Sequence, residues 1–275
     1  MPADIKAVGS FLPLTPDGAL INDTSLSHIE PSLAKETVRL YEQWFGDTLR
    51  SVYVRGSVAR GNAIPGCSDF DTFAVLDRDA LPQCPAPTDT ELKHLSMLAP
   101  GLTQFEFHAC TEANVLDSYY STWPFLIKTQ SVCLHGIDYA QQLENYYPGP
   151  EVMGEALYVP ERLRLYGERL QNEQQVAQKV NTCEWIMKAL VRAAFDLTMD
   201  RCRQYTRDLW LCHRTFAEYY SAQANDCHQA LCWAIEPDAD SIAQSELVNR
   251  LGAWITNEML RLVGQYGIDL SRYRL

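Results

Sequence analysis

The most constraining feature of the sequence is a pair of strand-like apolar segments that flank a loop rich in glycine and proline. The first segment covers residues 51–55 and stops at Gly56-Ser57, and the second covers residues 70–76 and carries Asp69 and Asp71 at its start. A Gly-Ser turn can hold a phosphate against backbone N–H groups and a hydroxyl. Two aspartates separated by one residue in a strand point to the same face. Because carboxylates this close repel unless a proton or a cation lies between them, the stretch predicts a metal–nucleotide site.

A third carboxylate is expected on the next strand, which the pattern predicts over residues 102–110. Glu106 is the only acid in this segment, and its aromatic neighbours make it a poor surface glutamate. Its alternatives are Glu112 and Asp117 on the following segment. Two residues after Glu106, His108 is expected on the same face, where we interpret it as a hydrogen-bonding histidine.

The chemistry that such a site serves is in-line transfer of a nucleotidyl group. Two divalent ions about 3.5–4 Å apart can activate the attacking hydroxyl and neutralise the leaving pyrophosphate. Carboxylate oxygens suit Mg²⁺, which keeps water and substrate phosphate in its shell. We therefore expect Asp69, Asp71 and Glu106 to bind Mg²⁺, with two ions, beside a nucleoside triphosphate. The simpler alternative is a Gly-rich turn followed by a strand with exposed aspartates.

This spacing resembles the signature of the nucleotidyltransferase superfamily that includes DNA polymerase β. The shared pattern is apolar–Gly-Ser, the spacer 58–68, and then Asp-apolar-Asp-apolar. The layout is most similar to the aminoglycoside-type nucleotidyltransferases, in which a C-terminal helical domain follows the nucleotidyltransferase domain. The motif covers residues 52–76, a looser likeness continues through Glu106 to residues 126–138, and beyond about residue 150 only the helical character is similar. Phe70 stands where many relatives have an aliphatic residue.

The resemblance implies a role for each residue of the motif. Gly56 and Ser57 would hold the β- and γ-phosphates of the nucleotide. Asp69 and Asp71 would bind Mg²⁺, and Glu106 would be the third carboxylate, either as a metal ligand or as the general base for the acceptor hydroxyl. Because all three acids are present, a catalytically dead relative is the less favoured alternative.

Further candidates for nucleotide binding lie outside the motif proper. Arg60 and Ser68 are predicted to add phosphate contacts. In the second half, Lys188 and Arg192 lie one helical turn apart and could grip the triphosphate, although a solvated helix face is the simpler interpretation. Thr206 is expected to be the N-cap of a helix over 206–220.

The rest of the pattern predicts an α/β (α+β) nucleotidyltransferase domain with a small mixed sheet, followed by an all-α helical-bundle domain. We expect an irregular arm over 1–30, the first domain over 31–147 and the helical domain over 151–275. Helices are predicted over 31–49 and 91–98, and over 113–145 with interruptions near Pro124 and Gly136. The second half predicts no strand, and helices near 158–177, 180–203, 206–220, 223–235 and 241–265 with a break at residues 178–179.

Composition restricts the partners and the compartment. The net charge of −12 argues against sequence-independent nucleic-acid binding and is compatible with a cationic or neutral small substrate. No apolar run reaches about 18 residues, so no transmembrane helix is expected, and the start lacks the layout of a signal peptide. Nine cysteines, an odd number without a Cys-x-x-Cys pair, favour a reducing cytoplasm.

Together these features predict a Mg²⁺-dependent enzyme that moves a nucleoside monophosphate, with AMP the first choice, from a nucleoside triphosphate such as ATP to a hydroxyl. The first choice of acceptor is a small, aminoglycoside-like molecule. One alternative is a macromolecular acceptor, either a protein or a tRNA. The other is a non-catalytic nucleotide-binding or antitoxin-like module.

Overall fold

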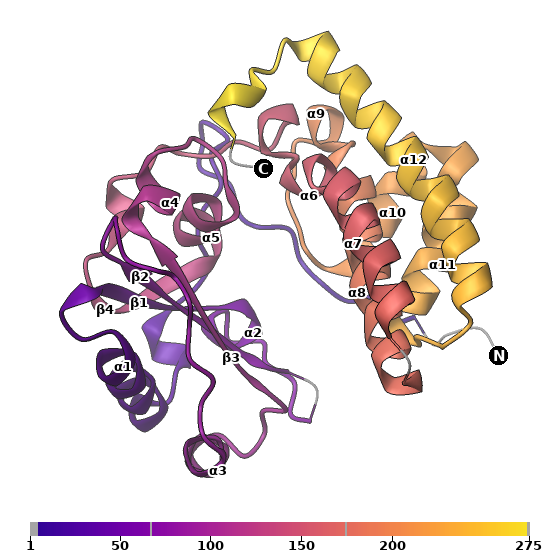
Figure 1. Ribbon diagram of the computed structural model, residues 1–275. Helices are drawn as coiled ribbons and strands as arrows, with labels where there is room; N and C mark the ends of the chain where they lie inside the picture. The colour runs from indigo at the N-terminus through magenta and orange to yellow at the C-terminus, as the bar shows by residue number, and fades with distance from the viewer. Residues whose placement is uncertain (1–4, 67, 174, 274–275) are drawn as a thin grey trace. The chain divides into compact units, whose positions relative to one another are not determined.

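The computed structural model describes residues 5–66, 68–173 and 175–273 (Figure 1). These residues form two compact units. The sheet unit contains Leu20–Tyr146 together with Arg272 and Tyr273, and the helical unit contains residues 5–19 and Tyr147–Ser271. The expected fold class, a small mixed sheet with its helices and a separate all-helical part, is confirmed.

Four strands form the sheet, in the order β3-β2-β1-β4. Strand β1 is antiparallel to both neighbours, whereas β2 and β3 are parallel, so the sheet is mixed. A parallel pair needs a crossover connection, and the segment containing helix α3 (Asp89–Leu98) provides it. The strands are β1 (Leu49–Arg55), β2 (Phe70–Leu76), β3 (Phe105–Thr111) and β4 (Ser131–Gly136).

The prediction of an interrupted helix over 113–145 is wrong. The chain forms α4 (Glu112–Leu116) and α5 (Thr122–Gln130), and β4 begins at the next residue and pairs with β1. A short apolar run does not distinguish strand from helix, and β4 is extended because its backbone groups bond to a strand far away in sequence. Pro124 does not interrupt a helix, because it lies in the first turn of α5, where a missing N–H is tolerated.

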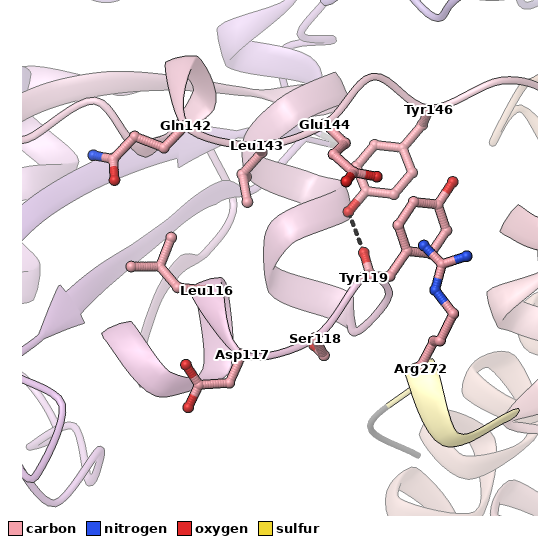
Figure 2. Close-up of a pocket in the computed structure, with 9 residues that line it drawn as sticks. All are labelled: Leu116, Asp117, Ser118, Tyr119, Gln142, Leu143, Glu144, Tyr146 and Arg272. Atoms are coloured by element: carbon pink, nitrogen blue, oxygen red, sulfur yellow. Dashed lines mark hydrogen bonds between the residues drawn. The ribbon is translucent and has the colours of Figure 1, made fainter.

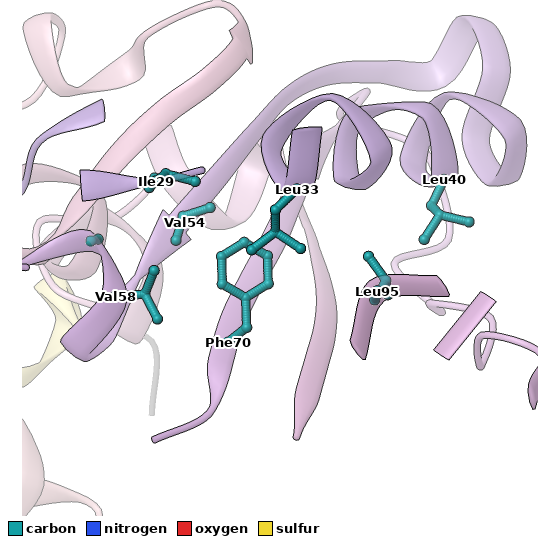
Figure 3. Close-up of a cluster of buried hydrophobic side chains, with 8 residues drawn as sticks. Ile29, Leu33, Leu40, Val54, Val58, Phe70 and Leu95 are labelled. Carbon is teal, nitrogen blue, oxygen red and sulfur yellow. The ribbon is translucent and has the colours of Figure 1, made fainter. Parts of the chain in front are cut away.

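One face of the sheet packs against α1 (Pro31–Phe45) and α3. Helix α1 begins at Pro31 because the carboxylate of Glu30 accepts a hydrogen bond from the Leu33 N–H. It ends at Phe45, earlier than predicted, since residues 46–48 form a 3₁₀ turn that leads into β1. The buried side chains between these helices and the sheet, shown in Figure 3, are Ile29, Leu33, Leu40, Val54, Val58, Phe70 and Leu95.

The opposite face of the sheet packs against α4, α5 and the 3₁₀ turn Tyr139–Gln141. Its core includes Tyr53 on β1, Phe73 on β2 and Cys110 on β3, and the rings of Tyr53 and Phe73 stack 5.1 Å apart. Successive side chains of a strand point to opposite faces. Arg55 and Asp71, each two residues from a member of this core, therefore belong to the same face.

The helical unit is organised around α8 (Val176–Asp196), whose second half is largely buried. Helix α8 contacts α7, α10, α11 and α12. The predicted break at residues 178–179 is wrong, since α8 begins at Val176. The remaining α-helices of this unit, labelled in Figure 1, are α6 (Gly154–Leu157), α7 (Val159–Asn172), α9 (Met199–Cys202), α10 (Leu209–Tyr219), α11 (Ala224–Ile235) and α12 (Ser241–Tyr266).

The N-terminal segment is attached to the helical unit by backbone and side-chain hydrogen bonds. The Leu12 N–H donates to the Tyr205 carbonyl at 2.8 Å, and the Thr206 hydroxyl donates to the Ser10 carbonyl at 2.8 Å. The prediction that Thr206 caps a helix is wrong, because α10 begins only at Leu209. No helix in the described residues has both the length and the apolarity required to cross a membrane.

Candidate active site

The register of the sheet brings three charged residues into one row across β1, β2 and β3. Arg55 is paired with Asp71, and Asp71 with Glu106. Neighbouring strands lie about 4.8 Å apart, so the three side chains emerge side by side on one face. Asp69 precedes Asp71 by two residues and is placed beside the row.

Three carboxylates converge at this point. One oxygen from each of Asp69, Asp71 and Glu106 lies within 4.8 Å of the others. Among residues 5–66, 68–173 and 175–273, this is the one group of three or more potential metal-ligating side chains with such proximity. Asp71 is buried, whereas Asp69 and Glu106 are half-buried.

Two basic side chains border the carboxylates. The Arg55 guanidinium Nη2 lies 2.7 Å from Asp71 Oδ1 and 3.9 Å from Glu106 Oε2. The Nε2 atom of His108 lies 3.4 Å from Glu106 Oε2, in line with the interpretation of His108 as a hydrogen-bonding histidine. Three carboxylates against one permanent cation leave the cluster short of positive charge.

The shortage of positive charge affects the pKa values of Asp71 and Glu106. Burial raises the pKa of Asp71 to about 6, against the effect of Arg55, and the charges of Asp69 and Glu106 raise it further. The hydrogen bond with His108 lowers the pKa of Glu106 to about 2. The interaction between the two carboxyls raises the pKa of Asp71 and lowers that of Glu106. Metal ligands are deprotonated, so a divalent cation bound here would compete with protons for Asp71.

The Gly-Ser turn lies directly beside Asp71. Gly56 and Ser57 open a one-turn helix, α2 (Gly56–Ala59), where the sequence predicted only loop. Gly56 has a φ of +80°, and a Cβ at this position would lie 2.5 Å from Asp71 Oδ2. Glycine is therefore required at this position for two reasons: its backbone conformation, and the space that the Asp71 carboxylate occupies.

Two other predicted phosphate contacts have partners within the protein. The Ser68 hydroxyl accepts a hydrogen bond from the Ile64 N–H at 2.8 Å, and the Ser68 N–H donates to the Ile64 carbonyl. This pair of bonds closes the loop immediately before Asp69. Arg60 Nε donates to Asp23 Oδ2 at 3.1 Å. Both residues thus help to hold the segment that connects Gly56 to Asp69.

The remaining candidates lie outside the carboxylate group. Lys188 belongs to the helical unit, where it forms an ion pair with Glu184 one turn earlier on α8. Arg192 Nε, also on α8, donates to the Arg207 carbonyl at 3.3 Å.

The two alternatives to Glu106 have other partners. Glu112 accepts a hydrogen bond from the Tyr139 hydroxyl at 2.6 Å. Asp117 is paired with Arg78.

Arg55 is the member of the site that sequence reasoning missed. Its neighbour in the motif is Gly56, and it lies two residues after the core residue Tyr53. The strand period of two would have placed its side chain on the face of Asp71, but only the pairing of β1 with β2 shows that it meets this particular carboxylate.

A cavity of about 460 Å³ lies on another part of the sheet unit and is drawn in Figure 2. The Arg272 guanidinium lies over the Tyr119 ring, 4.3 Å from its centroid, and the Tyr146 hydroxyl donates to the Tyr119 carbonyl at 2.5 Å. The clustered carboxylates do not contribute to its lining, so it is separate from the candidate active site. The lining residues are Leu116, Asp117, Ser118, Tyr119, Gln142, Leu143, Glu144, Tyr146 and Arg272.

Comparison with known proteins finds a likeness only to solved structures. No protein-family model matches the sequence, and no curated protein matches it. Among solved structures, the chain is similar to the spectinomycin adenyltransferase AAD(9) from Enterococcus faecialis, crystallised with ATP and spectinomycin. The TM-score is 0.44 and the sequences are 12% identical, with 83% of this chain and 98% of that chain covered. The function proposed below is based on the carboxylate site and its motif, and not on this likeness.

Proposed function

We propose that this protein is a Mg²⁺-dependent nucleotidyltransferase. It would move a nucleoside monophosphate, AMP in the first instance, from a nucleoside triphosphate to a hydroxyl of a small-molecule acceptor. The observation that carries the proposal is the convergence of Asp69, Asp71 and Glu106 within 4.8 Å, beside the turn that begins at Gly56. The motif that encodes this arrangement resembles that of the nucleotidyltransferase superfamily.

The donor set suits a hard divalent cation. All three ligands are carboxylates, and oxygen ligands are what Mg²⁺ binds in proteins. The raised pKa of Asp71 supports the same assignment, since a bound divalent cation would offset the burial of this carboxyl and the charges of Asp69 and Glu106. Bound Mg²⁺ would supply charge neutralisation at the leaving pyrophosphate and activation of the acceptor hydroxyl.

The low pKa of Glu106 distinguishes its two proposed roles. An efficient general base has a pKa near the working pH. The hydrogen bond with His108 lowers the pKa of Glu106, so Glu106 accepts a proton weakly at neutral pH. This favours Glu106 as a metal ligand.

The other residues position the nucleotide in this proposal. Gly56 and Ser57 would contact the β- and γ-phosphates. Ser68 and Arg60, through their bonds to Ile64 and Asp23, would hold the loop that carries Asp69 into place. Lys188 is a further proposed triphosphate contact, and its test is Lys188→Gln, which should weaken ATP binding without changing Mn²⁺ binding.

The test compares Asp69→Asn and Asp71→Asn with Asp77→Asn, which changes an aspartate beyond the other end of β2. Mn²⁺ binding is measured by calorimetry. Pyrophosphate release from ATP is measured with a panel of hydroxyl-bearing small molecules and with cell extract. The first two variants should lose both signals while retaining the wild-type circular dichroism spectrum, and Asp77→Asn should retain both. Full pyrophosphate release by Asp71→Asn contradicts the proposal.

The same assay identifies the acceptor class. Transfer of label from ATP to a product of low molecular mass supports a small-molecule acceptor. Label on a protein or a tRNA would show that the acceptor is a macromolecule and that the proposed small-molecule acceptor is wrong. Binding of ATP and Mg²⁺ without pyrophosphate release in any extract would indicate a non-catalytic module.

A further inference from the structure

Arg55 is held in place by the sheet, and its charged group lies among the proposed metal ligands. Its backbone is paired on one side with Asp71 and on the other with Ser131, so its Cα position is fixed by two strands. Its guanidinium lies 2.7 Å from Asp71 Oδ1 and 3.9 Å from Glu106 Oε2. The side chain remains 26% exposed, so it has solvent on one side into which it can turn.

Arg55 and a divalent cation would compete for Asp71. Arg55 Nη2 lies 2.7 Å from Asp71 Oδ1, so a cation bound by this carboxylate would have the guanidinium as its neighbour. Repulsion between two cations this close would lower the affinity for the ion by more than about tenfold. Binding of the ion would therefore favour movement of the guanidinium away from Asp71.

An anion next to Arg55 can receive the displaced guanidinium. The residue after Arg55 is Gly56, where the proposed site places the β- and γ-phosphates of the nucleotide. Arginine forms bidentate hydrogen bonds with phosphate as readily as with carboxylate. A rotation of the Arg55 side chain on its fixed backbone would exchange one partner for the other.

We propose that Arg55 is an internal counter-ion that occupies the metal ligands of the nucleotide-free protein and moves to the triphosphate when the metal binds. This proposal rests on the proposed function, because it takes the carboxylates as metal ligands. Arg55 weakens metal binding in the empty site and strengthens nucleotide binding in the loaded one, so metal and nucleotide bind cooperatively. Because coupling between two ligands is reciprocal, each raises the affinity of the other by the same factor.

The test measures Mn²⁺ affinity of the full-length chain by calorimetry and electron paramagnetic resonance, without nucleotide. Arg55→Gln and Arg55→Met should each bind Mn²⁺ at least about tenfold more tightly than the wild type, because a competing charge is removed. Arg55→Lys keeps the charge and should stay within about threefold of the wild type. At saturating Mn²⁺, both neutral variants should bind the non-hydrolysable α,β-methylene-ATP about tenfold more weakly, since one charge-assisted contact is lost.

Arg50 is the matched control, because it lies on the same strand and pairs with Asp77 beyond the other end of β2. Arg50→Gln should leave Mn²⁺ affinity unchanged. Equal or weaker Mn²⁺ binding by folded Arg55→Gln or Arg55→Met overturns the proposal and indicates a merely structural arginine. If the wild type and all variants fail to bind Mn²⁺, or if Asp71→Asn binds it normally, the proposed metal site itself is wrong. If only the neutral Arg55 variants differ from the wild type, the proposed metal site is retained.

Discussion

Gly56→Ala tests whether the space beside Asp71 is essential to the site. The substitution places a Cβ 2.5 Å from Asp71 Oδ2 and 3.5 Å from its Cγ. Ordinary contact requires the carboxylate oxygen to withdraw by about 1 Å. The backbone also has a φ of +80°, which disfavours an L-residue by about 1 kcal/mol. The variant therefore combines a modest loss of stability with a displaced metal ligand.

The two effects have separate measurements. Urea unfolding should show a loss of about 1–2 kcal/mol, from backbone strain and repacking of the carboxylate. Mn²⁺ affinity should fall about 10–100-fold, the range for changes beside a metal ligand. Nucleotidyl transfer should fall about 100-fold, as expected when a reacting group is misplaced by about 1 Å.

Gly267→Ala provides the control. Gly267 has a φ of +62°, and a Cβ there would meet nothing within 4 Å. This variant should lose about 1 kcal/mol of stability with unchanged Mn²⁺ affinity. Wild-type Mn²⁺ affinity in Gly56→Ala would contradict the predicted loss, because it would show that Asp71 is not a ligand or that its position is not critical. An equal loss of Mn²⁺ affinity in Gly267→Ala would show that the lower affinity of Gly56→Ala results from its lower stability.

Further predictions address pH, packing and a buried ion pair. Mn²⁺ affinity should fall by up to about tenfold per unit below pH 6 in calorimetric titrations, since Asp71, whose pKa burial raises to about 6, must release its proton to the solvent. For the same reason, the metal-free protein loses stability as the pH rises from about 4, the ordinary carboxyl pKa, through about 6. Leu40→Ala removes a fully buried side chain between α1 and the sheet and should lower the free energy of unfolding in urea by about 3 kcal/mol; a loss below about 1 kcal/mol would contradict this packing. Glu155→Gln leaves Arg162 and Arg207 without their carboxylate and should destabilise the helical unit by about 3 kcal/mol. Burial would raise the pKa of Glu155, but these arginines outweigh it and lower the pKa to about 2, so acid denaturation of the wild type between about pH 4.5 and 2 should include a contribution that is absent from the variant.

Much of the site follows from local patterns in the sequence. Strands over 51–55 and 70–76 are apparent because continuous apolar residues are bounded by glycine, proline and polar residues. The strand period of two places Asp69 and Asp71 on one face without knowledge of any partner strand. Glu106 is the only acid of a third apolar segment, and the parallel pairing of β3 with β2 sets it opposite Asp71.

Other features depend on contacts between residues that are distant in sequence. The local pattern of β4 does not distinguish strand from helix, and it predicts a helix. The segment is extended because of its hydrogen bonds to β1, about 80 residues earlier in the chain. Thr206 looked like an N-cap because its local sequence suits one, yet its hydroxyl bonds to the Ser10 carbonyl. In both segments the tertiary partner outweighed the local preference.

Local sequence is enough to specify the composition of the site: a Gly-Ser turn, two aspartates on one strand face and a third acid on another strand. These elements are local, since backbone geometry alone sets which side chains of a strand share a face. The row of Arg55, Asp71 and Glu106 requires the assembled sheet, because strand order and register determine which residues are opposite each other. Together with Asp69 beside the row, the site holds three carboxylates and one arginine, and this charge depends on the register and cannot be derived from any single strand.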